Sequence, residues 1–122
     1  MKVNPATILV VEHEPALRRL ARSVLEGRLG YRLILAERAE DVIERFELGQ
    51  VIDLVISDYH LPGMDGLALH HLLQRQGYRG RFVLTSGDPR ETVPMPDGVA
   101  FLPRPWTIDE LTHAIWAALE QR

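Results

Sequence analysis

The chain has 122 residues, which fits one compact domain and leaves little room for a second, so we expect residues 1–122 to form a single domain. Its residues are 46% hydrophobic and 25% charged, as in an ordinary globular protein. The absence of cysteine excludes disulfides, thiolate catalysis and cysteine-based zinc sites. The net charge is −3 and no helical segment gathers the basic residues into a stripe, so we do not expect this chain alone to bind nucleic acid.

No apolar run is long enough for a membrane span, because runs such as residues 7–11 are far shorter than the ~20 residues that a bilayer requires. The N-terminal residues contain no hydrophobic stretch that resembles a signal peptide. We therefore expect a chain that does not associate with membranes and that resides in the cytoplasm.

Five segments read as buried strands. Their apolar residues are continuous rather than alternating, which is typical of strands that are covered on both faces in a parallel sheet. In chain order the segments are Ile8–Val11, Leu33–Leu35, Leu54–Ile56, Phe82–Leu84 and Val99–Leu102.

Helical patterns separate these strands. Apolar residues recur at spacings of three and four in four segments, which are Pro15–Leu29, Ala39–Leu48, Gly66–Gly77 and Thr107–Glu120. Thr107 and Glu110 form a predicted capping box at the start of the last helix. The alternation of strands and helices predicts a doubly wound α/β sandwich.

The connection after the fourth strand is the exception. Pro89, Pro94 and Pro96 all lie between residues 87 and 98, and the last two cannot occupy a helix interior. At most one helical turn fits, around residues 90–93, so we expect a loop with a short or degenerate fourth helix.

Polar side chains follow four of the predicted strands directly. Glu12 and His13 follow the first strand, Asp58 the third, Thr85 the fourth and Arg104 the fifth. Ligands of open α/β sheets bind outside the carboxyl ends of the strands. We therefore expect these side chains to converge at one edge of the sheet.

The segment from Asp53 to Gly66, DLVISDYHLPGMDG, resembles the phosphoacceptor segment of response-regulator receiver domains. The segments Ile8–Pro15, Leu84–Gly87 and Phe101–Trp106 follow in the order and approximate spacing of that family. The resemblance covers essentially the whole chain, and the residues around Thr85 are similar to receivers of hybrid histidine kinases. It implies a flavodoxin-like fold whose five parallel strands have the order 2-1-3-4-5.

The function that this resemblance implies is two-component signal transduction. A histidine kinase or phosphotransfer protein would be the partner, and Asp58 would accept its phosphoryl group, so we expect a signalling domain rather than an enzyme. The family binds Mg²⁺ with acidic side chains after the first strand, here Glu12 and His13, with the phosphoacceptor, and with a backbone carbonyl that corresponds to His60. A homodimer is left open.

The resemblance also assigns residues around the phosphoryl group. Thr85 would donate its hydroxyl, and Phe101 stands where many receivers have a switching aromatic residue. Arg104 stands where the family has a lysine, and it would pair with Asp58 in the resting state. Pro105 is a candidate for a cis peptide bond. Phe101 can equally be an ordinary core residue.

This sequence departs from the family at the metal site and in its length. Mg²⁺ prefers oxygen ligands, so the imidazole of His13 is a poor substitute for a carboxylate. These residues therefore fit Mg²⁺ less well than the family's acidic pair does. His13 could instead bind a softer ion, carry a positive charge beside Asp58, or only form a hydrogen bond. The stretch from Thr85 to Arg104 is also a few residues shorter than in the family.

Two other functions compete with phosphoryl acceptance. The first is a degenerate receiver that acts as a phosphorylation-independent protein-interaction module, and the second is a small hydrolase with Asp58 as its nucleophile. Trp116 lies off the centre of the last helix's apolar stripe and would suit an interface if exposed. It can equally lie partly buried at the edge of that stripe. We expect His70, His71 and His113 to be surface residues.

Overall fold

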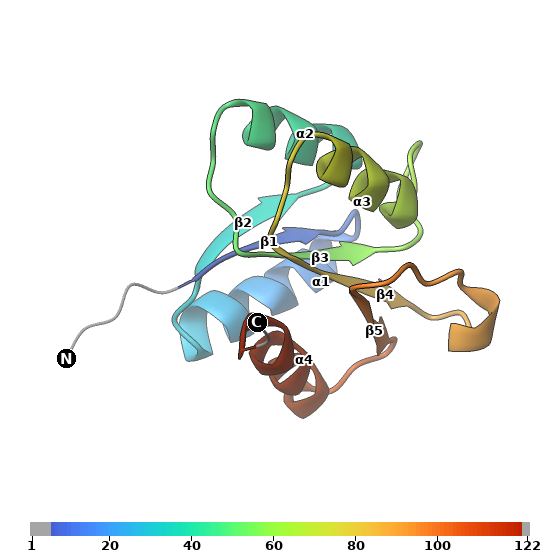
Figure 1. Cartoon of the computed structure of the whole chain (residues 1–122). Coiled ribbons are helices and arrows are strands. Elements are labelled where there is room, and N and C mark those ends of the chain that lie inside the picture. Colours follow the sequence, from blue (N-terminus) through green and yellow to red (C-terminus); the bar gives the residue numbers. More distant parts are fainter. Residues whose placement is uncertain (1–5, 121–122) are drawn as a thin grey trace.

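A computed structural model describes residues 6–120 as a sheet between two layers of helices (Figure 1). Five parallel strands form the sheet in the order β2-β1-β3-β4-β5. Their bounds are Thr7–Val11 for β1, Arg32–Ala36 for β2, Leu54–Asp58 for β3, Arg81–Ser86 for β4 and Val99–Pro103 for β5. The flavodoxin-like fold and the strand order predicted from the sequence are confirmed.

The helices lie on both faces of this sheet, with α1 and α4 on one face and α2 and α3 on the other (Figure 1). The α-helices are α1 Pro15–Ala21, α2 Ala39–Glu47, α3 Gly66–Arg75 and α4 Ile108–Glu120. Two further helical segments are η1 Arg22–Arg28 and η2 Arg90–Thr92. No helix within residues 6–120 is long and apolar enough to cross a bilayer.

Two apolar clusters, one on each face, fix the sheet between the helices. Alternate residues of β1 point to opposite faces, so Ile8 packs in the cluster of α1 and α4 while Leu9 packs in the cluster of α2 and α3. All five residues of β3 are buried. Burial of the central strands on both faces fixes the position of their carboxyl ends. The polar side chains predicted to converge lie at these ends.

The first helix differs from its prediction. It was expected to continue unchanged to Leu29, but from Arg22 it widens into a π-helix in which the Leu29 N–H donates to the Val24 carbonyl at 3.0 Å. Val24 and Leu25 of this π-helix are buried in the core, whereas Leu20, which precedes it in α1, is 41% exposed. Side-chain spacing alone does not distinguish these two helix types.

The predicted loop after β4 and the predicted cap of α4 are confirmed. The connection contains one 3-10 turn, η2, and then an extended segment whose Val93 is buried against the sheet. At the start of α4 the Thr107 N–H donates to Glu110 Oε1 at 2.8 Å, and the Glu110 N–H donates to Thr107 Oγ1 at 3.0 Å. Both reciprocal bonds of the capping box are therefore formed.

His70 was wrongly predicted to lie on the surface. His71 and His113 are exposed as expected, but His70 is only 7% exposed, and its ring meets that of Phe82 edge to face at a centroid distance of 4.9 Å. Burial lowers the pKa of the His70 imidazole below its usual value, because the charged ring loses its hydration.

We expect the burial of His70 to make the protein less stable in mild acid. The unfolded chain takes up this proton near pH 6.5, the ordinary value, whereas the folded chain takes it up only at a lower pH. The free energy of unfolding should therefore fall as the pH drops below about 6.5, and His70→Leu should remove part of that fall. Urea denaturation between pH 7.5 and 5 measures both slopes, with His113→Gln as a control at an exposed histidine. Equal slopes for the wild type and His70→Leu would refute this role.

Candidate functional site

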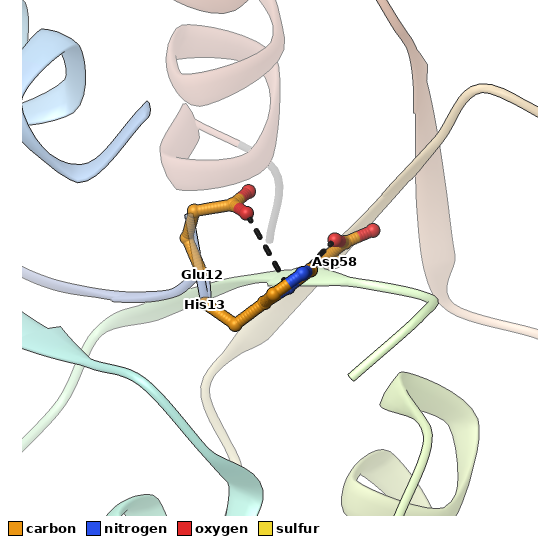
Figure 2. Close-up of side chains that lie close together, drawn as sticks. All are labelled: Glu12, His13 and Asp58. Carbon is orange, nitrogen blue, oxygen red and sulfur yellow. Dashed lines mark ion pairs between the residues drawn. The ribbon is translucent and has the colours of Figure 1, made fainter. Parts of the chain in front are cut away.

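The polar residues singled out in the sequence meet at the carboxyl edge of the sheet. Glu12 and His13 follow β1, Asp58 ends β3, and Figure 2 shows these three side chains directed toward one another. Thr85 is the strand neighbour of Asp58 in β4. Arg104 follows β5 and contacts Glu12. The predicted convergence is thus observed for all four strands.

Glu12 and Arg104 form a buried ion pair. The Arg104 guanidinium donates to Glu12 Oε1, and the side chains are 18% and 5% exposed for Arg104 and Glu12 respectively. The other carboxylate oxygen of Glu12, Oε2, accepts from the Glu14 N–H at 3.1 Å. The expected pairing of Arg104 with Asp58 is also present, as a longer ion pair of 3.6 Å between Nη2 and Oδ2, so the guanidinium is shared by the two carboxylates.

The Asp58 carboxylate is enclosed but not saturated with partners. Its residue is 3% exposed, and Oδ1 accepts from the His60 N–H at a long 3.3 Å. Burial raises the pKa of the Asp58 carboxyl, against the opposing effects of that N–H and of the nearby His13. His13 Nδ1 at 3.9 Å and Arg104 Nη2 at 3.6 Å both lie beyond hydrogen-bond distance of Oδ2, which leaves its lone pairs for a reacting group.

Thr85 has an unused hydroxyl beside this carboxylate. The residue is 4% exposed, and its Oγ1 has no hydrogen-bond partner within residues 6–120. Thr85, Arg104 and Glu12 line a common cavity of about 20 Å³, in which Arg104 Nε is likewise without a partner among the described residues. Leaving a buried polar atom without a hydrogen bond costs free energy. A new hydrogen-bond partner in this cavity would therefore stabilise both Thr85 Oγ1 and Arg104 Nε.

Glu12, His13 and Asp58 also offer a set of metal-binding atoms. One atom of each residue lies within 4.8 Å of the others, and His13 Nδ1 is 3.8 Å from Glu12 Oε2 and 3.9 Å from Asp58 Oδ2 (Figure 2). The set fits the implied Mg²⁺ poorly, because one donor is an imidazole nitrogen and the Glu12 carboxylate is already paired with Arg104.

One contact at this edge was not foreseen. The exposed imidazole of His60 pairs through Nε2 with Asp88 Oδ2 at 2.6 Å, and the Asp88 N–H donates to Ser86 Oγ at 3.0 Å. The pair joins the loop after β3 to the loop after β4. Sequence reasoning considered only the backbone of His60, and no local pattern pointed to Asp88.

Phe101 and Pro105 complete the predicted set. The peptide bond between Arg104 and Pro105 is cis, as expected. Phe101 is half-buried and packs against the apolar cluster of α2 and α3, which agrees with its interpretation as a core aromatic residue of β5.

Gly66 holds the start of α3 against the backbone of Asp58. Its N–H donates to the Tyr59 carbonyl at 2.9 Å, and the preceding Asp65 caps the helix by accepting from the Ala68 N–H at 2.8 Å. A Cβ at Gly66 would stand 2.5 Å from the Asp58 carbonyl oxygen and 2.8 Å from a methyl carbon of Leu84. The absence of a side chain here permits the close approach.

We expect Gly66→Ala to destabilise the fold by roughly 1–3 kcal/mol, because the added methyl group forces packed backbone apart. Chemical denaturation measures this loss, and the NMR amide shift of Asp58 should report the displaced strand end. Gly87→Ala is the matched control, since its Cβ would meet nothing within 4 Å. Equal stability of the two variants would show that the approach of α3 to Asp58 is not tight.

The sequence profile described as the response regulator receiver domain matches residues 8–116. The chain belongs to this family. It is 31% identical to the sensor kinase CckA of Brucella abortus (strain 2308) over 122 aligned residues, which cover 96% of this chain and 13% of the kinase. It is 37% identical to the transcriptional regulatory protein AruR of Pseudomonas aeruginosa over 82 residues, which cover 64% of this chain and 33% of that protein. The receiver chain thus spans well under half of either relative.

Solved receiver structures share the fold. The crystal structure of the receiver domain from hybrid histidine kinase CckA has a TM-score of 0.79 and 33% identity, and the match covers 94% of this chain and all of that one, 100%. The signal receiver domain of an HD domain-containing protein from Pseudomonas fluorescens Pf-5 has a TM-score of 0.85 and 28% identity, with coverage of 98% and 90%. The chain is therefore a receiver domain of two-component systems.

Proposed function

We propose that this receiver accepts a phosphoryl group on Asp58 from a histidine kinase or phosphotransfer protein. The observation that carries the proposal is the surroundings of the Asp58 carboxylate at the end of β3. A guanidinium and an imidazole come together there with the Thr85 hydroxyl, which has no hydrogen-bond partner among residues 6–120. Membership of the family and the relation to a sensor kinase support the class of partner.

The transfer is a displacement at phosphorus. An oxygen of the Asp58 carboxylate attacks the phosphorus of a phosphohistidine, a P–O bond forms as the P–N bond breaks, and the donor imidazole leaves with the electron pair of that bond. Negative charge spreads over the phosphoryl oxygens during this step, so nearby positive groups lower the barrier. Arg104 Nη2, 3.6 Å from Asp58 Oδ2, supplies a permanent positive charge at this position.

Arg104 would change partners in this reaction. In the structure Glu12 holds the guanidinium, whereas a phosphorylated Asp58 would present more negative charge and more acceptor oxygens at almost the same place. A phosphoryl group can be bound bidentately by arginine, which a lysine cannot do. We therefore propose that phosphorylation draws Arg104 away from Glu12, with the Thr85 hydroxyl donating to another phosphoryl oxygen.

The proposal predicts a single phosphoryl adduct that depends on Asp58. The purified chain should gain the mass of one phosphoryl group when incubated with a small phosphodonor such as phosphoramidate. Asp58→Asn should gain none, because the amide is not a nucleophile for phosphorus. A divalent cation at the Glu12, His13 and Asp58 cluster is part of the proposal, so Mg²⁺ and Mn²⁺ are supplied in separate incubations. Intact-mass spectrometry measures the result.

Asp53→Asn is the matched control for this assay. Asp53 is an exposed carboxylate at the opposite end of β3, where it accepts from the Thr7 N–H at 2.8 Å. This variant should be modified as fully as the wild type. A wild-type chain that stays unmodified with either cation would contradict phosphoryl acceptance and favour a receiver that acts only as a protein-interaction module.

A further inference from the structure

We propose that Glu12, His13 and Asp58 form a mixed imidazole and carboxylate site that binds a borderline divalent transition-metal ion in preference to Mg²⁺, with His13 Nδ1 as a ligand. This inference concerns the same site as the proposed function and rests on that function for the role of the bound ion. Its evidence is the chemistry of the donor atoms and their arrangement at the end of β1 and β3.

His13 Nδ1 lies near both carboxylates of the cluster. It stands almost equally far from the two carboxylate oxygens that face it, at 3.8 Å from Glu12 and 3.9 Å from Asp58 (Figure 2). Metal bonds of about 2.1 Å place neighbouring ligand atoms roughly 3 to 3.5 Å apart. His13 Nδ1 therefore needs to approach each of these carboxylate oxygens by only a fraction of an ångström to share an ion with it.

The His13 ring is much more exposed than the two carboxylates. Its side chain is 42% exposed, whereas those of Glu12 and Asp58 are 5% and 4% exposed. The ring is therefore less confined by packing than the two carboxylates, which are buried at the ends of β1 and β3. The exposed side of His13 leaves room for water to complete the coordination.

The net charge of the site also favours a transition-metal ion over Mg²⁺. Arg104 already neutralises one of the two carboxylates, so the site offers an ion less negative charge than a set of free carboxylates would. Mg²⁺ depends on hard oxygen ligands and loses its hydration reluctantly, so such a site holds it weakly. A transition-metal ion gains from the imidazole nitrogen whatever the net charge, and affinities for such sites rise from Mn²⁺ through Co²⁺ to Ni²⁺.

The test uses Co²⁺ and Mg²⁺ with the full chain, purified without a histidine tag and with no phosphodonor. Calorimetry gives both affinities, and the visible absorption of Co²⁺ reports nitrogen ligation. We expect the wild type to bind Co²⁺ at least about tenfold more tightly than Mg²⁺. His13→Asp should narrow this difference, because the variant loses the nitrogen contribution to the Co²⁺ spectrum, binds Co²⁺ more weakly and binds Mg²⁺ more tightly than the wild type does.

Two control variants locate the ion. His113→Asp makes the same chemical change at an exposed histidine of α4 and should leave both affinities unchanged. His60→Asn removes the imidazole paired with Asp88 and should also retain Co²⁺ binding. Loss of Co²⁺ binding in His60→Asn but not in His13→Asp would place the ion at the His60 pair and overturn the inference. A wild type that prefers Mg²⁺, or that binds Co²⁺ unchanged after His13→Asp, would overturn it too.

Failure of this inference is distinguishable from failure of the proposed function. A chain that binds Co²⁺ through His13 but never gains a phosphoryl group would refute only phosphoryl acceptance. A chain that is phosphorylated on Asp58 but prefers Mg²⁺ would refute only the metal preference.

Discussion

Replacing Arg104 with methionine should destabilise the folded chain by about 3–5 kcal/mol, because it leaves the Glu12 carboxylate buried without its charge partner. Glu12 is 4% exposed, so water cannot replace the guanidinium without opening the structure. The other carboxylate oxygen of Glu12 accepts from the Glu14 N–H and lies 3.8 Å from His13 Nδ1, and neither group supplies a permanent positive charge. Urea denaturation at neutral pH measures the loss.

Two further variants separate the buried charge from lost packing. Glu12→Gln combined with Arg104→Met removes both charges, so the double variant should recover most of the stability lost by Arg104→Met alone. Arg22→Met breaks an exposed pair with Glu26, whose side chains are 53% and 46% exposed, and should change stability by no more than about 1 kcal/mol. An Arg104→Met chain as stable as Arg22→Met would show that the Glu12 pair does not hold the site together.

Leu84→Ala should cost about 2–5 kcal/mol, because Leu84 is fully buried and its truncation leaves a cavity between the sheet and α3. The side chain lies in β4, between Ser57 of β3 and Phe101 of β5 in the register. Thermal and urea denaturation measure the loss. Leu48→Ala is the control, since Leu48 is 80% exposed and its truncation should be nearly neutral.

Leu84 should also couple to Gly66. A Cβ at Gly66 would meet a Leu84 methyl carbon at 2.8 Å and the Asp58 carbonyl at 2.5 Å, so truncating Leu84 relieves one of these two contacts. Gly66→Ala should therefore cost less in the Leu84→Ala background than in the wild type, though not nothing. Additivity within about 0.5 kcal/mol in a double-mutant cycle would contradict the packing of α3 described above.

The sheet could be predicted from the sequence because its signals are local. Continuous apolar runs such as Leu54–Ile56 mark strands covered on both faces, and their alternation with helical patterns fixes a doubly wound fold. The three prolines after β4 limited that connection to one turn, and Thr107 with Glu110 marked the start of α4. Each of these inferences needs only neighbouring residues.

The features that were missed depend on partners far apart in the chain. Glu12 and Arg104 are separated by 92 positions, and His60 and Asp88 by 28, so neither pair has a sequence signature. The family resemblance predicted the pairing of Arg104 with Asp58, but it did not predict that the same guanidinium also pairs with Glu12. His70 was placed outside because a polar residue within a helix is usually exposed, and only its neighbour Phe82 in the fold reveals the apolar pocket.

The exposure of a side chain at the edge of an apolar stripe cannot be predicted from the sequence alone, because it depends on what surrounds the helix. Trp116 was left between an interface residue and a partly buried one, and it is 61% exposed, with its ring 6.4 Å from that of His113. The direction of the last helix's apolar stripe was correct for Leu111 and Ile115, which are buried.

The most direct test of the account is to locate the phosphoryl group chemically. An acyl phosphate reacts with hydroxylamine to give a hydroxamate at the modified carboxyl, and tandem mass spectrometry of the peptides identifies that residue. We predict that the hydroxamate appears at Asp58 after incubation with a phosphodonor and is absent from Asp53, Asp65 and Asp88. A hydroxamate at any of these other carboxylates, or at none, would contradict the claim that Asp58 is the phosphoryl acceptor of this receiver.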